Sequence, residues 1–570
     1  MRQFHRNKAD ISDFRFQSSN LKASEASSQT KTPILHVAAL RSLRLCGAAT
    51  FSSNAETQRA QRKRFQNLTQ TQQLWLIKDS SRQLRAIWNS QFAICNLNYV
   101  RPILFVVVAA WLAMSSSLVS AADWPTNRGN VARTGCVDGL PGPRSGKVLW
   151  VHKSSDHYIA APVAAGDSVL VSALAAFNTS IFQALSTETA PKQRVRWAKS
   201  VPYLKLPTVC APAVVGNVVV FGDGMHQTDG ATLHGVRLDT GLPLWQLPVP
   251  GQLVHLEGSP SIVNGKVLIG GGNAGVLCVD PARLELDGKE VDAASAQAAL
   301  DKKWKELLAK YEQEKKTDPD FAIAPSEDSL PKPKPKLVWQ AGAGKWHVDA
   351  AVAAVGDRVL VATAFLDAEK TGERAICSVK LSDGDVQWKT PLTFNPWAGP
   401  TVAGDLVLVG CSSVRLEPKE IASGQGEVLA VSLADGSVKW RRAFAAGIVS
   451  AIAVKDQIAV FTATDGKVRA VDVTSGAEKW TVDGGSPFFA SAAIAGDVVY
   501  VADLKAVVRA IGLTDGSLRW KLSLGTDATV KAPGMVYGGP IIAGGRLFVA
   551  TCALESGGKA NTAVVCIGDK

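Results

Sequence analysis

The stretch that decides the fold runs from Gly496 to Trp520 and reads GDVVYVADLKAVVRAIGLTDGSLRW. A close copy, KDQIAVFTATDGKVRAVDVTSGAEKW, runs from Lys455 to Trp480. Each copy contains short runs of alternating apolar residues, which predict half-buried β-strands. The glycine of each Thr-Asp-Gly or Thr-Ser-Gly segment supplies the positive φ that a tight turn needs.

The same unit occurs eight times along the chain. One strand of each unit reads GDSVLVSA, GNVVVFGD, NGKVLIGG, GDRVLVAT, GDLVLVGC, KDQIAVFT, GDVVYVAD and GGRLFVAT in turn. A phrase of small apolar residues, such as CAPAVV or SAIAV, precedes each of them and predicts a strand that packs near a common axis. A third and a fourth strand follow, so the chain repeats a four-stranded unit.

A tryptophan ends the fourth strand of seven units, and a slim residue recurs in the third strand of all eight. The tryptophans are Trp197, Trp245, Trp339, Trp388, Trp440, Trp480 and Trp520, and the slim residues are Ala184, Gly235, Cys278, Ser378, Ala430, Ala470, Ala510 and Cys566. The eighth tryptophan, Trp150, precedes the first unit, whereas the last unit stops at Ile567 without a fourth strand. We therefore expect residues 147–151 to pair as the outer strand of the last unit.

These units predict an all-β fold, an eight-bladed β-propeller of four-stranded blades in which the N- and C-terminal strands close the last blade. Each indole brings about 200 Å² of mostly apolar surface to a blade junction, which at ~25 cal/mol per Å² stabilises the junction by several kcal/mol as an upper bound. A slim residue opposite leaves room for the ring, so the two columns repeat together.

The first 121 residues are excluded from the propeller. Residues 1–99 form a Gln/Ser/Arg-rich extension, interpreted either as an unusually long disordered leader or as the result of a mistaken translation start. Residues 100–121 predict a cleavable signal peptide, with a short apolar stretch from Ile103 to Met114 and small residues before Ala122. Nearly all of the net charge of +12 lies in this leader, so we predict no nucleic-acid partner. We expect residues 122–570 to be an exported monomer without a transmembrane segment, in the periplasm or outside the cell.

Two segments then suggest a family. AVDVTSGAEKW, from Ala470 to Trp480, and AIGLTDGSLRW, from Ala510 to Trp520, resemble the tryptophan-docking motif of quinoprotein-type propellers. ADWPTNRGN, which contains Trp124, resembles the entry segment of exported members. The resemblance covers about residues 124–569 and implies the eight-bladed fold. For activity it implies two classes, pyrroloquinoline quinone (PQQ) dehydrogenases and non-enzymatic members such as the outer-membrane assembly lipoprotein.

The resemblance implies that a PQQ dehydrogenase would carry adjacent cysteines, an Asp base and a calcium ion held by oxygen ligands. The sequence has no Cys-Cys pair and no Cys-x-x-Cys-His motif. We therefore predict an exported non-enzymatic scaffold that binds a protein or a small ligand and needs no cofactor. A PQQ-dependent dehydrogenase with Ca²⁺ is the alternative, and a metal or small-ligand sensor is a second alternative.

The interval of 94 residues between Trp245 and Trp339 contains an insertion in the third blade, at residues 281–336. Leu300, Trp304, Leu307, Leu308 and Tyr311 follow helical spacing and predict an amphipathic helix. The segment PKPKPK at 331–336 predicts an extended, polyproline-like tether without regular hydrogen bonds. The helix either covers apolar surface of the propeller or serves as a docking arm for a protein partner. Loops on one face of the ring are a second place where a protein partner could bind.

One column of polar and aromatic residues precedes the innermost strands. It begins with His157, His255 and His347 in blades 1, 3 and 4. Two positions further on it holds Glu257 and Asp349 in blades 3 and 4, Trp397 in blade 5 and Tyr537 in blade 8. Innermost strands line the axial channel, so these side chains are candidates for a ligand site at one channel mouth. They either bind a divalent cation or small polar ligand, or they hydrogen-bond channel water and loop backbone. No catalytic residue and no firm metal ligand is predicted.

Cys552 and Cys566 lie in the last hairpin and raise the question of a disulfide. By analogy with the TDGK turn of the sixth unit, Cys566 should lie opposite Ala550, with Cys552 one pair away on the diagonal. Diagonal Cα atoms are about 7 to 8 Å apart, which is beyond easy bridging. We therefore predict no bond between them, and a role for Cys566 as the slim neighbour of a tryptophan.

Overall fold

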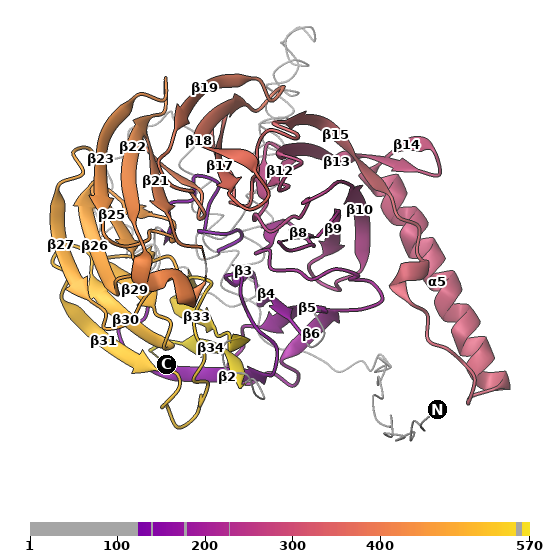
Figure 1. Ribbon diagram of the computed structural model, residues 1–570. Helices are drawn as coiled ribbons and strands as arrows, with labels where there is room; N and C mark the ends of the chain where they lie inside the picture. Colours follow the sequence, from indigo (N-terminus) through magenta and orange to yellow (C-terminus); the bar gives the residue numbers. More distant parts are fainter. Residues whose placement is uncertain are drawn as a thin grey trace, which may run out of the picture. The chain divides into compact units, whose positions relative to one another are not determined.

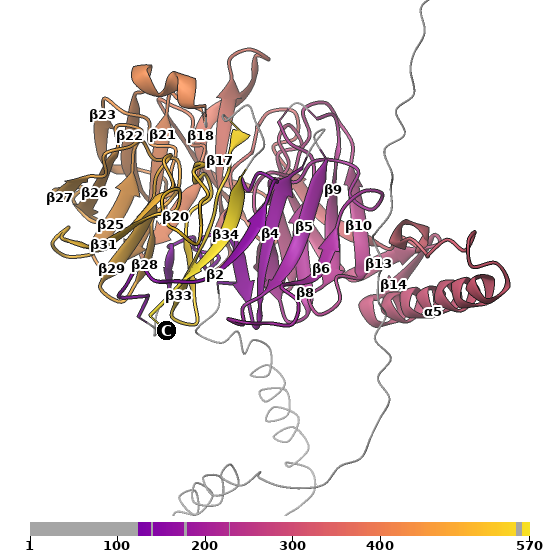
Figure 2. The same ribbon diagram turned by 90° about the horizontal axis from the view of Figure 1, so that it is seen from below.

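Eight β-sheets surround a common axis in the computed structural model, which describes residues 124–137, 141–175, 179–226, 228–415, 417–554 and 561–569. Figure 1 shows them as a ring, and Figure 2 shows the same ring from its edge. The predicted eight-bladed propeller is confirmed. The predicted extension at 1–99 and signal peptide at 100–121 lie outside the described residues. Among the described residues, no helix has the length and apolar character to cross a membrane.

The blades are built in chain order, each from the axis outward. Blade 1 contains β3 (Val163–Ala165), β4 (Ser168–Leu174), β5 (Ser180–Ser186) and β6 (Val195–Lys199); blade 2 contains β7 (Ala213–Val215), β8 (Val218–Gly222), β9 (Ala231–Arg237) and β10 (Pro243–Val249). Blade 3 contains β11 (Ser261–Val263), β12 (Lys266–Gly270), β13 (Val276–Leu286) and β15 (Lys334–Ala341); blade 4 contains β16 (Ala353–Val355), β17 (Arg358–Leu366), β18 (Thr371–Lys380) and β19 (Val386–Pro391).

The second half of the ring repeats this order. Blade 5 contains β20 (Pro400–Ala403), β21 (Leu406–Ser412), β22 (Gly426–Ser432) and β23 (Val438–Phe444); blade 6 contains β24 (Ala453–Lys455), β25 (Ile458–Thr462), β26 (Lys467–Asp472) and β27 (Glu478–Asp483). Blade 7 contains β28 (Ala493–Ala495), β29 (Val498–Ala502), β30 (Val507–Gly512) and β31 (Leu518–Ser523); blade 8 contains β32 (Ile541–Ala543), β33 (Arg546–Ala550), β34 (Thr562–Ile567) and β2 (Val148–Ser154).

Every predicted slim residue lies directly opposite its tryptophan in the strand register. The pairs are Ala184–Trp197, Gly235–Trp245, Cys278–Trp339, Ser378–Trp388, Ala430–Trp440, Ala470–Trp480, Ala510–Trp520 and Cys566–Trp150. A register irregularity adjoins each pair, which is the local bend expected of a β-bulge. The repeat of the sequence is therefore a repeat of one packing arrangement.

The indoles also join each blade to the next. Trp480 Nε1 donates to the Leu513 carbonyl oxygen at 2.8 Å, and Trp440 Nε1 donates to that of Val473 at 2.9 Å. The turn glycine of the next blade lies against the ring, and a Cβ added at Gly476 would meet Trp440 at 2.6 Å. Gly476 also has a φ of +69°. Position 476 thus requires glycine for two reasons: the positive φ of the turn, and the space that the Trp440 indole occupies next to it.

The two ends of the chain close the ring in blade 8. β2 pairs antiparallel with β34, and Trp150 lies opposite Cys566 as predicted. The prediction that Cys566 lies opposite Ala550 was wrong, because Phe548 occupies that position. Cys552 is therefore four positions along the strand from the residue that faces Cys566, which is too far for a disulfide between them.

The N-terminal segment Trp124–Val137 runs along the inner strands, and part of it is β1 (Cys136–Val137) beside β28. Backbone carbonyls of this segment accept hydrogen bonds from the inner strands of blades 1, 2, 4, 5, 6 and 7, at Ala164, Val214, Ala354, Val402, Val454 and Ile494. The buried Arg133 guanidinium donates to the carbonyls of Ser259, Pro260 and Val352. This segment, called the axial segment below, lies against the inner strands that were expected to line the axial channel.

The insertion in blade 3 contains β14 (Lys289–Asp292), α5 (Ala293–Thr317) and η3 (Glu327–Ser329). Ala296 and Leu300 of α5 are buried, and Ala296 packs in the cluster that contains Trp245. The helix therefore covers propeller surface, as one interpretation expected. The prediction that 331–336 lacks regular hydrogen bonds was wrong for its second half, because residues 334–336 belong to β15 and pair with β13. The insertion is also bound to blade 1 by the ion pair of Glu327 with Lys199.

Candidate functional site

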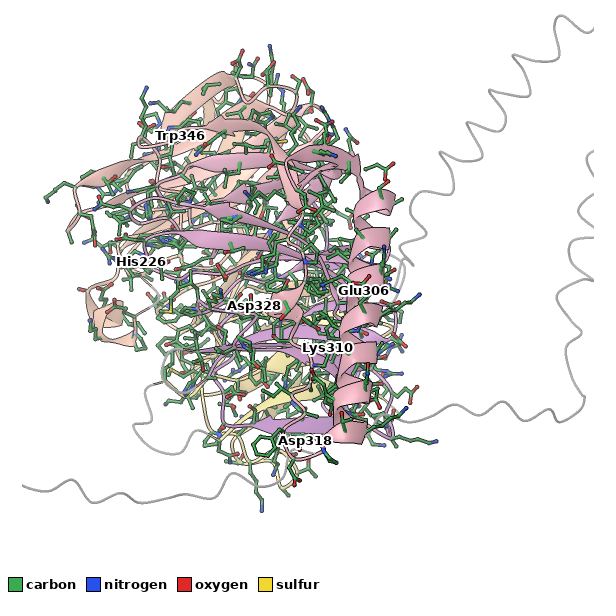
Figure 3. All side chains as sticks on the ribbon, turned by 90° about the vertical axis from the view of Figure 1, so that its right-hand side faces the viewer. His226, Glu306, Lys310, Asp318, Asp328 and Trp346 are labelled. Carbon is green, nitrogen blue, oxygen red and sulfur yellow. The ribbon has the colours of Figure 1, made fainter. Side chains whose placement is uncertain are left out.

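The loops before the inner strands and the loops after the second strands emerge on one face of the propeller, called the site face below. His226 follows β8, His255 lies between β10 and β11, and His347 and Asp349 lie between β15 and β16. α5 replaces a turn between the third and fourth strands, which belongs to the opposite face. Figure 3 accordingly shows His226 at the edge of the molecule away from α5.

Four side chains of blades 2, 3 and 4 meet on the site face and are called the His3Asp cluster. They are His226, His255, His347 and Asp349, and one ligand atom from each lies within 4.8 Å of the other three. Asp349 Oδ1 lies 2.8 Å from His255 Nε2 and 3.0 Å from His347 Nε2. Both imidazoles are fully buried, whereas the Asp349 side chain is 13% exposed.

Residues around the cluster hold its members in place. His347 Nδ1 lies 2.7 Å from Asn273 Oδ1, and the backbone N–H of His226 donates to the Glu257 carboxylate. Asn273 belongs to the glycine-rich turn at residues 270–275. A Cβ added at Gly272 of this turn would lie 3.0 Å from His255 Cε1, so the turn must be slim to pass beside the imidazole.

Burial and charge set the ionisation of these groups. Burial raises the pKa of Glu257 to about 7. Burial also acts to raise the pKa of Asp349, but hydrogen bonds from His255 and His347 and their charge bring it well below its usual range. Burial lowers the pKa of His226. For His255 burial acts in the same direction and is the largest single influence, but the hydrogen bond to Asp349 and the charges of Asp349 and Glu257 together outweigh it, so the pKa is raised.

The predicted column therefore divides into three parts. His255, Glu257, His347 and Asp349 come together with His226. His157 lies apart, since its Nδ1 accepts a hydrogen bond from the Ala553 backbone N–H at 3.2 Å and the residue pairs with Leu174. Trp397 and Tyr537 contribute to an apolar cluster with Phe489 and Val449, and the Phe489 and Tyr537 rings are 5.5 Å apart.

Sequence reasoning missed His226, because it does not belong to the column before the inner strands. The available signal was topological. In an antiparallel blade, the loop after the second strand reaches the same face as the loop before the inner strand. A histidine in GMHQTDG, between the second and third strands of blade 2, was therefore a candidate for the same site.

The donor set of the cluster is chemically selective. Three imidazole nitrogens and one carboxylate oxygen suit Zn²⁺ and neighbouring first-row transition metals. Calcium takes six to eight oxygen ligands, which this cluster does not offer. The cluster thus does not fit the calcium ion that a PQQ dehydrogenase would carry.

Two segments of the chain, residues 136–303 and 419–568, match the family described as outer membrane protein assembly factor BamB. Together they make up more than half of the sequence. The chain belongs to this family. His226 and His255 lie within the matched segments, whereas His347 and Asp349 lie in the unmatched part between them. No curated protein matches the sequence.

Solved structures show the same fold at low identity. A europium-containing methanol dehydrogenase is 11% identical with a TM-score of 0.52, over 79% of this chain and 98% of that chain. A quinohemoprotein alcohol dehydrogenase from Comamonas testosteroni is 13% identical with a TM-score of 0.51, over 81% and 82%. BamB from Moraxella catarrhalis is 13% identical with a TM-score of 0.44, over 73% and 98%. At these identities the likeness to the two dehydrogenases shows the propeller fold alone.

Proposed function

We propose that this protein is an exported propeller that binds a divalent transition-metal ion through the His3Asp cluster and acts by binding rather than by turnover. The proposal rests on one observation, the convergence of four suitable ligand atoms within 4.8 Å from three blades. Tetrahedral zinc sites with bonds of about 2.0–2.1 Å keep their ligand atoms roughly 3.4 Å apart. Small side-chain rotations therefore suffice to bring the four atoms around one ion.

Hydrogen bonding around the imidazoles supports the same function. Among the described residues, His226 Nε2, His255 Nδ1 and His347 Nε2 are buried nitrogens without a hydrogen bond of good geometry, although His347 Nε2 lies 3.0 Å from Asp349 Oδ1. Buried polar atoms are normally paired, so unpaired imidazole nitrogens gathered in one cluster suggest a ligand that completes them. The contact of His347 Nδ1 with Asn273 is the kind of outer contact that orients a metal-binding imidazole.

The fold provides a rigid support for such a site. His255 and Asp349 precede β11 and β16, and the Arg133 side chain binds the backbone at Ser259 and Val352 shortly after them. The axial segment thus fixes both loops from the side of the axis. A site on loops anchored in this way can hold its ligand geometry without large rearrangement.

Titration of metal-free protein with ZnCl₂ by calorimetry tests this proposal. We expect one ion per chain, with affinity lowered at least tenfold in His226→Ala and in Asp349→Asn. His157→Ala is the matched control, because His157 belongs to the same sequence column but lies outside the cluster, and its affinity should be unchanged. Zinc at a hundredfold excess over Kd should stabilise the fold by about 2.7 kcal/mol. Absence of binding, or equal loss in His157→Ala, would refute the proposal.

A protein partner is the second candidate, supported by the family described as an outer membrane protein assembly factor. The insertion exposes Leu308 of α5 and, beyond it, Phe321 and Ile323, which are 80% and 81% exposed. Pull-down from native envelope, with and without residues 284–330, should recover a partner only with the intact chain. Export itself is tested by the N-terminus of the mature protein, which we expect at Ala122.

A further inference from the structure

A polar cavity of about 420 Å³ lies on the site face at blades 4 and 5. Arg374, Asn395, Trp397, Ser413 and Arg415 contribute to its lining. Its volume falls in the range of small-molecule sites, which combine apolar walls with a few fixed polar groups. The cavity and the His3Asp cluster share blade 4, so their spatial relation decides whether they act together.

The β17–β18 hairpin joins the cavity to the cluster. His347 pairs with Ala364, and the next residue, Phe365, donates its backbone N–H to Asn395 of the cavity wall at 2.9 Å. On the other strand, Thr371 Oγ1 lies 3.4 Å from Asn273, the residue that holds His347, and Arg374 of the cavity follows three positions later. Two separate connections thus place the cavity beside the cluster.

The charged groups of the cavity differ in how they are paired. Arg374 binds Asp367 at 2.8 Å, and its Nε donates to Asn395 at 3.2 Å. Arg415 donates its backbone N–H to Glu420 at 2.9 Å, but its guanidinium has no hydrogen bond or ion pair with any residue that the structure describes. Arg415 is half-buried, and its charge acts on His226 and on the neighbouring Glu417 carboxylate. The guanidinium is therefore a cation of the cavity wall without a hydrogen-bonded partner among the described residues, with the Glu417 and Glu420 carboxylates in its neighbourhood.

The aromatic wall offers a further unused donor. Trp397 Nε1 is buried and has no hydrogen-bond partner in the described part of the chain. An indole N–H can only donate, as can a guanidinium. A ligand that satisfies both must present acceptor oxygens, and arginine matches the paired oxygens of a carboxylate or phosphate particularly well.

We propose that the cavity binds a small anionic ligand, bearing a carboxylate or a phosphate, that bridges the metal ion of the His3Asp cluster and the Arg415 guanidinium. This inference rests on the proposed metal site and adds the ligand class to it. The anion would supply an oxygen to the metal and leave its other oxygens to Arg415 and Trp397.

Cobalt provides a probe for this bridge, because its visible absorption changes when its ligands change. Protein loaded with Co²⁺ would be titrated with inorganic phosphate and, in a second arm, with acetate, while the spectrum and the heat are recorded. At least one anion should change the cobalt spectrum and bind at least tenfold more tightly than to metal-free protein. The stronger arm identifies phosphate or carboxylate as the preferred group.

Arg415→Gln should weaken anion binding at least tenfold while Co²⁺ still binds with unchanged affinity. Arg519→Gln, which alters an exposed arginine of blade 7, is the matched control and should leave both affinities unchanged. Cobalt binding without any anion effect, or anion binding that ignores Arg415 or the metal, would overturn this inference and leave the metal site standing. Failure of cobalt to bind would overturn both.

Discussion

The indole N–H of Trp480 provides a measurable test of how blades are joined. Trp480→Phe removes the 2.8 Å hydrogen bond to the Leu513 carbonyl but keeps an aromatic ring in the slot opposite Ala470. Trp150 is its natural control, because it occupies the same position in blade 8. The two side chains are similarly buried, since Trp150 is 6% exposed and Trp480 is 9% exposed. Trp150 Nε1 has no hydrogen-bond partner among the described residues, and the Arg194 guanidinium covers the ring at 4.0 Å instead.

The expected difference follows from these contacts. Both substitutions lose part of the buried ring area, so that cost cancels in the comparison. Trp480→Phe additionally loses a hydrogen bond and leaves a buried carbonyl oxygen unsatisfied, which costs about 1–3 kcal/mol. We therefore expect Trp480→Phe to lower the free energy of unfolding by about 1–3 kcal/mol more than Trp150→Phe. Urea denaturation followed by circular dichroism measures both values.

Equal losses in the two variants would refute the role assigned to the indole hydrogen bond. A larger loss in Trp150→Phe would do so as well, and would indicate that the contact with Arg194 or the closure of the ring dominates. Trp480→Ala sets the scale, since truncation of a buried tryptophan costs about 3–5 kcal/mol.

Three further predictions concern the frame around the site. Gly476→Ala should destabilise the fold more than Gly544→Ala. Both glycines have a positive φ, but a Cβ added at 476 would lie 2.6 Å from Trp440, whereas a Cβ added at 544 would meet no atom within 4 Å. Denaturation midpoints of the two variants give the comparison. Arg133→Met should lower the free energy of unfolding by about 1–3 kcal/mol, because it removes the hydrogen bonds of the guanidinium and leaves the buried Ser259 carbonyl without a donor, whereas Pro260 and Val352 keep Thr126 and Ser261. Equal stability to the native protein would contradict this. Burial lowers the pKa of His152, which lies in β2, the outer strand of blade 8. The unfolded chain therefore binds a proton at this residue at a higher pH than the folded protein does. The free energy of unfolding should fall as the pH drops from 7 through about 6.5. His152→Gln should flatten that slope in urea titrations at several pH values.

The tryptophan columns could be predicted from sequence because one packing arrangement recurs at a regular interval. Each indole needs a slim neighbour, so spacing alone identified all eight pairs, including the closure through Trp150. The register of the last hairpin was not predictable by the same analogy. The loop between β33 and β34 is far longer than the tight turn between β25 and β26, so it does not fix the pairing of Cys566.

Neither the axial segment nor the complete His3Asp cluster could be predicted from the repeat of the sequence. Residues 124–137 bind the ring largely through backbone groups, which leave no side-chain pattern in the sequence. The column before the inner strands supplied His255 and His347, which recur at one position of the unit, and Asp349, which lies two positions later. His226 comes from a different loop, and only the three-dimensional closure of blades 2 to 4 brings it to the others.

An anomalous difference map at the zinc edge, from crystals of the zinc-loaded protein, tests the metal site most directly. It should contain a peak bounded by His226, His255, His347 and Asp349, with bonds of about 2.0–2.2 Å to their nitrogen and oxygen atoms. A map with no peak there, or with zinc only at other positions such as His157, would contradict the account of the site.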